Sequence, residues 1–171
     1  MSAYGVYVEL AKHAGVIPEF ESVTSPEEEA LMKIINASTG TESYHRSSLL
    51  TDWFYHTDGV HALATQAKCF WLIDIIVSWQ HADHVRREPF QCWTLEKRLV
   101  LPRPQERRGE KIPVEWVVRC TDGGNGDYER DLCRQYIPSS DFPLDSLTLW
   151  VEDGAAPDGT LCKVLLLPSE H

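Results

Sequence analysis

The pattern of apolar residues changes at Pro89, and this change restricts the chain to a small set of folds. Before Pro89 the apolar residues recur at helical spacing, whereas strand-like runs follow it. Helices followed by strands predict an α+β fold, in which helices cover one face of a sheet. The expected strands are residues 90–101, 114–120, 128–137, 147–152 and 161–167.

The segments between these runs are rich in turn-forming residues. Two examples are Asp122-Gly123-Gly124-Asn125-Gly126 and Ser140-Asp141-Phe142-Pro143. Short connections favour antiparallel neighbours, so the sequence predicts an antiparallel meander sheet of about five strands.

Three helices are expected between residues 25 and 82. Ser25, Pro26 and Glu28 form a capping-box pattern that begins the first helix. Thr57 or Asp58 caps the second helix, after a loop over residues 38–52. The third helix, residues 69–82, is apolar nearly all round, which predicts a buried central helix on one face of the sheet, after a break near Lys68.

Length and charge narrow the class of protein. The chain has 171 residues and a net charge of −10. This length predicts a single domain over residues 1–171, with residues 1–50 as a helical N-terminal extension. An acidic chain is a poor ligand for nucleic acid, although the basic stretch over residues 86–111 is compatible with either a solvated loop or a local anion-binding patch.

The cysteines and the lengths of the apolar runs bear on the compartment. The five cysteines are widely spaced and form no Cys-x-x-Cys pair. This pattern is typical of free thiols in a reducing environment, so we expect a cytoplasmic protein. No apolar run approaches the roughly 20 residues of a membrane span, so we expect no membrane association.

Polar residues on the third helix offer one candidate for catalysis. Asp74, Ser78 and His81 fall on one stripe of this helix. A carboxylate desolvated among apolar neighbours is suited to acid–base chemistry, and Asp58 is a second candidate. The alternative is that the stripe is the solvent-facing side of the helix.

Four histidines raise the question of a metal site. His56, His61, His81 and His84, with Asp58, carry groups that bind zinc. Their spacing matches no metal motif, so the sequence predicts neither a metal site nor a cofactor.

Aromatic and acidic residues are candidates for binding a partner. Trp53 and Tyr55 form either an exposed interaction patch or a hydrophobic staple in the core. Glu27, Glu28 and Glu29 offer electrostatic complementarity to a basic partner. Asp141 is either a binding residue or the cap of the Phe142-Pro143 turn.

Several separated strings form a recurring order. They are Tyr55-His56-Thr57-Asp58-Gly59-Val60, Phe70-Trp71-Leu72-Ile73-Asp74, Gln80, Phe90-Gln91-Cys92-Trp93-Thr94-Leu95, Ser140-Asp141-Phe142-Pro143-Leu144 and Leu167-Pro168-Ser169-Glu170-His171. Over residues 51–171 the chain resembles a small uncharacterised domain family of bacteria, phages and mobile elements. Members of that family end more often in Tyr than in His171. The resemblance implies no catalytic residue, and it suggests a role in conflict between mobile elements and host defence.

Taken together, these features lead to two hypotheses of function. The first is a cytoplasmic protein-binding or inhibitor protein with a protein partner. The alternative is a small hydrolase or transferase that uses Asp74 and Asp58, with His81 assisting. The oligomeric state stays open.

Overall fold

The computed structural model describes residues 24–48, 51–100, 114–124, 128–156 and 158–171. Its centre is a seven-stranded sheet with the order β1-β2-β7-β6-β3-β4-β5. The strands are β1 (Tyr44–Ser48), β2 (Thr51–Thr57), β3 (Phe90–Leu99), β4 (Val114–Thr121), β5 (Asp131–Ile137), β6 (Ser146–Ala155) and β7 (Leu161–Leu166). The helices are α2 (Pro26–Ala37), α3 (Asp58–Gln66), α4 (Phe70–Trp79), α5 (Asp83–Arg86) and the short 3₁₀ helix η2 (Pro168–Glu170).

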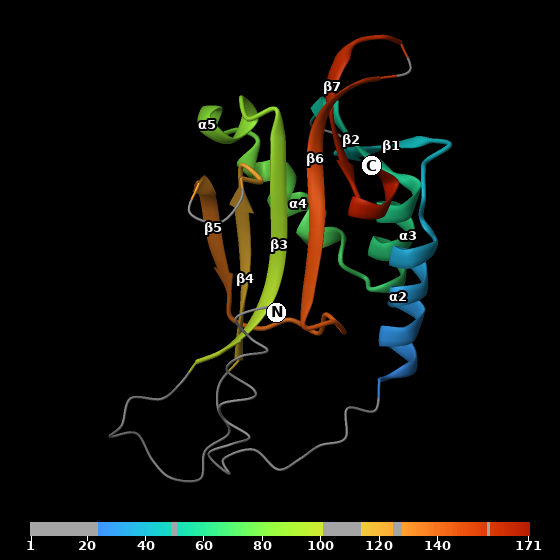
Figure 1. The fold of residues 1–171 in the computed structure, drawn as a ribbon, viewed down its shortest axis with the longest axis vertical. Coiled ribbons are helices and arrows are strands. Elements are labelled where there is room, and N and C mark those ends of the chain that lie inside the picture. Colours follow the sequence, from blue (N-terminus) through green and yellow to red (C-terminus); the bar gives the residue numbers. More distant parts are fainter. Residues whose placement is uncertain (1–23, 49–50, 101–113, 125–127, 157) are drawn as a thin grey trace.

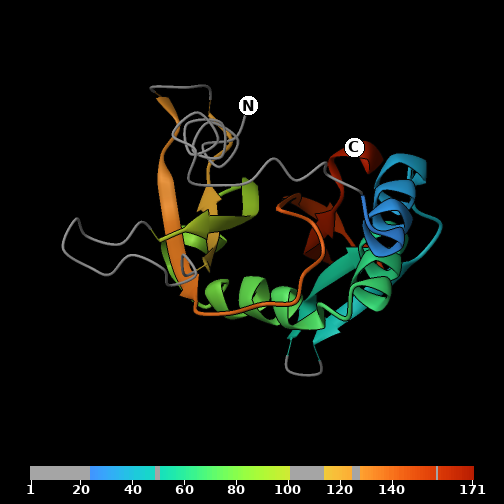
Figure 2. The same ribbon diagram turned by 90° about the horizontal axis from the view of Figure 1, so that it is seen from below.

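The sheet curls around α4, as Figures 1 and 2 show together. At one end of α4, Phe70 meets the ring of His61 on α3 edge to face, and His61 stacks on His45 of β1. At the other end Trp79 Nε1 donates a hydrogen bond of 3.1 Å to Gln135 Oε1 on β5. The helix therefore spans the curled sheet from one edge strand to the other.

The α+β class is confirmed, but the simple meander is wrong. Strands β3, β4 and β5 do form an antiparallel meander. The chain then crosses back and places β6 on the other side of β3, with β7 next to it. Strand β2 pairs in parallel with β7, which makes the sheet mixed.

The loop expected over residues 38–52 is also wrong. Residues 44–48 and 51–57 form an antiparallel hairpin at the edge of the sheet. Strand β1 is almost wholly polar, so it lacks the apolar alternation that identifies a strand. Trp53 and Tyr55, expected either as a staple or as a patch, lie within β2 on either side of the fully buried Phe54.

The helix starts follow the sequence. Ser25 Oγ accepts a hydrogen bond from the Glu28 backbone N–H, and Glu28 Oε2 accepts one from the Ser25 N–H, so the capping box is present. Thr57 caps α3. Lys68 adopts a φ of +52°, so the helical conformation is interrupted between α3 and α4, as expected.

Helix α4 is less buried than its composition predicts. Leu72, Ile73, Ile76 and Val77 are buried against the core. Phe70 is 42% exposed, and Asp74 and Ser78 are exposed too. The helix lies on one side of the sheet with nothing described covering its outer face, so the all-round apolar pattern overstates its burial.

A buried pair of glutamines joins α4 to β3. Gln80 and Gln91 are both 0% exposed, and their amides exchange hydrogen bonds of 2.8 and 3.1 Å. Gln91 also donates to the Val85 carbonyl and accepts from Trp93 Nε1. The end of α4, helix α5 and strand β3 are therefore held by one satisfied polar network.

The start of α3 is clamped by the C-terminal segment. Glu170 accepts hydrogen bonds from Thr57 Oγ1 (2.6 Å) and from the Gly59 N–H (3.1 Å). A Cβ atom on Gly59 would lie 2.7 Å from Glu170 Oε1 and 2.8 Å from the Cβ of Ser38. This close approach requires glycine at residue 59.

We expect Gln91→Leu to lower the free energy of unfolding by about 2–3 kcal/mol, because it leaves the Trp93 indole N–H and Gln80 Oε1 buried without partners. Urea denaturation measures this change. Gln66→Leu, at an exposed position of α3, is the control and should change stability little. Equal stabilities for Gln91→Leu and the wild type would contradict the importance of this network.

We expect Gly59→Ala to destabilise the fold by about 1–3 kcal/mol, since the added methyl group displaces the Glu170 carboxylate and crowds Ser38. Gly40→Ala is the matched control, because the structure describes no atom within 4 Å of its Cβ position. Its unfolding midpoint should stay near that of the wild type. If both substitutions had the same effect, the close approach would not matter.

Candidate functional site

A cavity of about 340 Å³ lies where α2, the α3–α4 turn and the segment before β6 meet. Helix α2 contributes Glu27 and Leu31 to its wall. The end of α3 and the turn contribute Gln66, Ala67 and Lys68, and the β5–β6 segment contributes Asp141 and Pro143. Two residues expected from the sequence to bind a partner, Glu27 and Asp141, therefore line the same cavity.

Local structure explains how both carboxylates come to line it. The Ser25 cap places Glu27 in the first turn of α2, while the neighbouring Glu28 is used in the capping box. On the other wall Phe142 is buried and packs edge to face on Trp116, which anchors the segment. Ser140 Oγ, rather than Asp141, accepts the hydrogen bond from the Phe142 N–H, so Asp141 is not the cap of this turn.

The backbone at the cavity is strained. Lys68 has a φ of +52°, a left-handed conformation that side chains other than glycine rarely adopt. Its cost is on the order of 1 kcal/mol, and such strain occurs most often at ligand sites and switch regions. The surrounding packing, with the Cys69 N–H donating to the Ala64 carbonyl, holds this turn in place.

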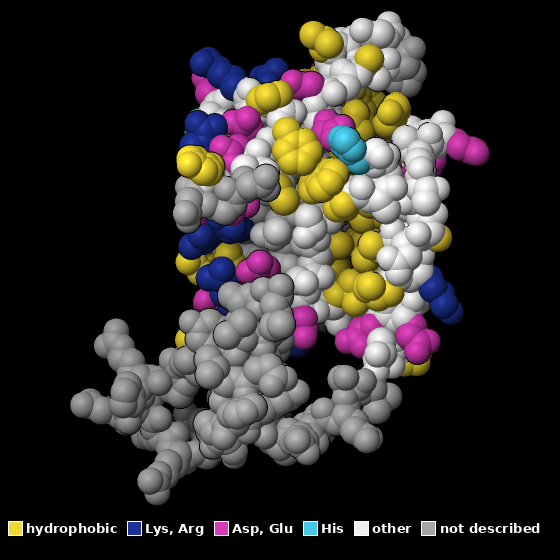
Figure 3. Space-filling view, in the orientation of Figure 1, with side chains coloured by type: hydrophobic (Ala, Val, Ile, Leu, Met, Phe, Trp, Pro, Cys, Tyr) yellow, Lys and Arg dark blue, Asp and Glu magenta, His cyan; other side chains and the backbone are white. Residues whose placement is uncertain are grey.

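The lining of the cavity combines apolar and charged residues. Leu31, Ala67 and Pro143 are apolar, whereas Glu27 and Asp141 bring two carboxylates and Lys68 one ammonium group. Figure 3 shows apolar side chains in the band between the sheet and α2, with acidic side chains near the lower end of that helix. The lining suits a cationic group on an apolar stem.

The other predicted acidic residues are placed differently. Glu28 is committed to the helix cap, and Glu29 is exposed on α2 without lining the cavity. Of the three glutamates, only Glu27 lines the cavity together with Asp141.

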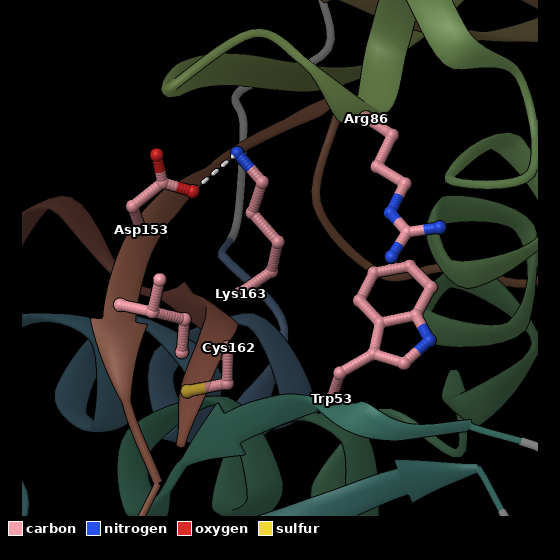
Figure 4. Close-up of a pocket in the computed structure, with 6 residues that line it drawn as sticks. Trp53, Arg86, Asp153, Cys162 and Lys163 are labelled. Carbon is pink, nitrogen blue, oxygen red and sulfur yellow. Dashed lines mark ion pairs between the residues drawn. The ribbon is translucent and has the colours of Figure 1, made fainter. Parts of the chain in front are cut away.

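Trp53 and Tyr55 are half-buried parts of β2. The Arg86 guanidinium lies 4.2 Å above the Trp53 ring, beside a shallow cavity of about 190 Å³ (Figure 4). Lys163, in the same cavity, already binds Asp153 at 2.7 Å and the Glu88 carbonyl at 2.6 Å. Tyr55 packs on the small cluster around Cys162. Both aromatic residues thus contribute to packing within the fold.

The candidate catalytic residues are not brought together. Asp74, Ser78 and His81 are all exposed, so their stripe is the solvent side of α4 and its C-terminal end. In the described part of the chain, neither hydrogen bonds nor ion pairs link Asp58 to Asp74 or to His81. Of the two alternatives left open by the sequence for Asp74, its exposure favours the solvent-facing side of the helix.

Asp58 organises the turn before β1. It accepts hydrogen bonds from the backbone N–H groups of Glu42 and Ser43, from Thr41 Oγ1, and from His45 Nε2 at 2.8 Å. The His45 hydrogen bond and the Ser43 N–H lower the pKa of Asp58 to about 2. The carboxylate is therefore ionised and oriented toward His45.

Three histidines lie together beside Asp58. His45 on β1 and His56 on β2 are register partners across the hairpin, and His61 on α3 lies beside them. The His45 and His61 rings stack with centroids 4.1 Å apart, and His56 Nε2 lies 3.2 Å from His61 Nδ1. Each ring offers one ligand atom, and these atoms lie within 4.8 Å of one another.

Burial and mutual repulsion lower the pKa of two of these histidines, His56 and His61. His56 is 4% exposed, and its desolvation, together with the neighbouring His45 and His61, lowers its pKa to about 4. Desolvation and His45 also lower the pKa of His61. The imidazoles of His56 and His61 are thus neutral near pH 7.

Sequence reasoning grouped the wrong histidines. His56 and His61 do meet, but His81 is exposed at the end of α4, and His84 bonds the Leu132 carbonyl from α5. His45 was missed, because its segment was expected to be a loop. Recognising the 44–57 hairpin would have placed His45 opposite His56.

The chain matches the family of unknown function DUF6876 over residues 29–171. It belongs to this family. The match begins within α2, further toward the N-terminus than the resemblance seen in the sequence. It includes Lys68, Asp141 and the three clustered histidines, whereas Glu27 precedes it. No curated protein and no solved structure matches the chain.

Among the described residues, no helix is long and apolar enough to cross a membrane.

Because the pKa of His56 is lowered by folding, we expect the free energy of unfolding to fall as the pH is lowered. The protein is treated with a chelator first, so that it is free of metal ions. Between pH 6.5 and about 4 the unfolded chain protonates residue 56 while the folded chain does not, so stability present above pH 6.5 is lost by up to about 3 kcal/mol as the pH falls. Urea denaturation at pH 7.0, 5.5 and 4.5 measures this loss. In His56→Gln the loss should be smaller. If stability fell as steeply in His56→Gln as in the wild type, the loss would be due to other titratable groups.

Proposed function

We propose that this protein binds a protein partner through the cavity between α2 and the β5–β6 segment, with Glu27 and Asp141 receiving a cationic side chain. The observation that supports this function is that both acidic residues line one cavity, together with the apolar Leu31, Ala67 and Pro143. A Lys or Arg side chain has the matching shape, since its apolar stem packs on Leu31 and Pro143 while its charged head meets the carboxylates.

Charge supports the same proposal at longer range. The net charge of −10 attracts a basic partner and speeds its encounter, and the cavity then fixes its orientation. The buried Leu31 and the anchored Phe142 keep both walls in place before binding, which lowers the entropic cost of association.

The resemblance to families of phages and mobile elements supports a narrower form of this function. In that form the protein is a cytoplasmic inhibitor, and its partner is a basic component of a host defence complex. Acid–base catalysis by Asp74 and Asp58 is not part of the proposal, because Asp74 is solvent-exposed and Asp58 is engaged with His45.

The test is a pull-down from host lysate with the tagged full-length protein and two variants. We expect Glu27→Lys/Asp141→Lys to weaken retention of the partner at least about tenfold, because the introduced lysines then repel the cationic side chain of the partner. Glu29→Lys changes a neighbouring exposed residue outside the cavity and should keep the partner. Equal retention by the double variant and by Glu29→Lys would reject the cavity as the binding site.

A further inference from the structure

The three clustered histidines form an arrangement of ligands that the proposed partner site does not use. They come from separate elements, β1, β2 and α3, and the sheet register and the start of α3 bring them together. Their ligand atoms lie within 4.8 Å of one another. Such convergence of imidazoles needs a reason, since each ring alone would be better hydrated on the surface.

One pair already has the spacing of metal ligands. With zinc–nitrogen bonds of about 2.05 Å and tetrahedral angles, two ligand nitrogens lie about 3.3 Å apart. His56 Nε2 and His61 Nδ1 are 3.2 Å apart. An ion that binds both therefore requires no change in their separation. The third ring, His45, must tilt out of its stack on His61 to complete the set.

In two of the three rings, His45 and His56, the nitrogen that would not bind the ion has a partner that suits metal binding. His45 Nε2 meets Asp58 Oδ1 at 2.8 Å, so the carboxylate holds a proton there and leaves the lone pair on Nδ1. His56 Nδ1 lies 2.9 Å from Ser47 Oγ, which accepts a hydrogen bond from Nδ1–H when Nε2 binds the ion. A carboxylate or hydroxyl that accepts a hydrogen bond from the second nitrogen of a ligating histidine fixes the tautomer of that ring and strengthens its bond to the metal.

The ligand type selects the class of ion. Three neutral imidazoles favour zinc and the neighbouring transition metals, whereas magnesium and calcium prefer oxygen ligands. The His45 and Asp58 side chains are 35% and 40% exposed, so the site opens to solvent on that side. Three protein ligands with an open side leave a fourth position for water or another small ligand.

We propose that His45, His56 and His61 bind one Zn²⁺ ion, with Asp58 as the positioning residue behind His45 and the fourth coordination position open to solvent. The ion would tie the edge hairpin β1–β2 to the start of α3. His45 Nε2 and His56 Nδ1 keep their protons and donate them in hydrogen bonds to Asp58 and Ser47. The proton between His56 Nε2 and His61 Nδ1 moves to His61 Nε2, so the ion binds three neutral imidazoles and no net proton is released.

The experiment is a titration of full-length, chelator-treated protein with Zn²⁺ by calorimetry and with Co²⁺ by visible absorption. We expect one ion per chain and a raised unfolding temperature on zinc addition. The Co²⁺ d–d spectrum should be typical of a four-coordinate site. His61→Ala and His45→Ala should each weaken binding by at least about 100-fold, and Asp58→Asn by about 10- to 100-fold. His81→Ala, which removes an exposed imidazole elsewhere, should bind as the wild type does.

Three outcomes would overturn the proposal. They are no stoichiometric binding, binding that is equal in the wild type and in both histidine variants, and near-ultraviolet charge-transfer bands that reveal thiolate ligands from the five cysteines. His45 is partly exposed on an edge strand, so His45→Ala gives a folded comparison even where His61→Ala does not. Circular dichroism of each variant establishes that it is folded before the titration.

Discussion

The parallel pairing of β2 with β7 is the contact on which the rest of the molecule depends. It joins Phe54, Tyr55 and His56 to residues 163–165, which are more than 100 residues away in the chain. A parallel pair requires a long crossover, and here the crossover contains α3, α4, α5 and the four strands β3 to β6. The Glu170 carboxylate reinforces this junction by binding Thr57 and Gly59, directly after β2. Without the pairing of β2 with β7, the edge hairpin and the start of α3 would have no fixed place relative to the sheet.

The motifs that carry the family resemblance are largely explained by this architecture. Thr57 and Gly59 meet Glu170, which joins the first and last of the strings in space. Gln80 and Trp93, from two further strings, both bond Gln91 in the buried network. These residues are needed to hold elements together, so their recurrence does not by itself point to a functional site.

Local signals were enough to predict the elements, but not their neighbours in the sheet. The capping box at Ser25, the Thr57 cap and all five strands after Pro89 follow from nearby residues. The return of β6 to the free edge of β3 depends on contacts between distant segments, which no local pattern records. The polar strand β1 was missed because a sheet edge tolerates polar residues on both faces.

The candidate sites show the same division. The charge of the first turn of α2 indicates Glu27, and the recurring strings indicate Asp141, while their place in one cavity depends on how α2 and the β5–β6 segment lie in the fold. His56 and His61 were weighed as ligands and set aside on spacing along the chain. Spacing along the chain does not reveal the grouping of three histidines, because His45 and His56 lie on paired strands, where the distance in space is set by the register and not by the separation in sequence.

Helix α3 connects the two proposed sites, since it carries His61 near its start and Gln66 at its end. A rigid helix of nine residues is about 13 Å long, so an ion at one end could affect the cavity at the other only by moving the helix. Thr57 and Glu170 hold the start of α3, and Lys68 fixes the turn that follows its end. With both ends held, metal binding and partner binding should act independently, and each can be tested without disturbing the other.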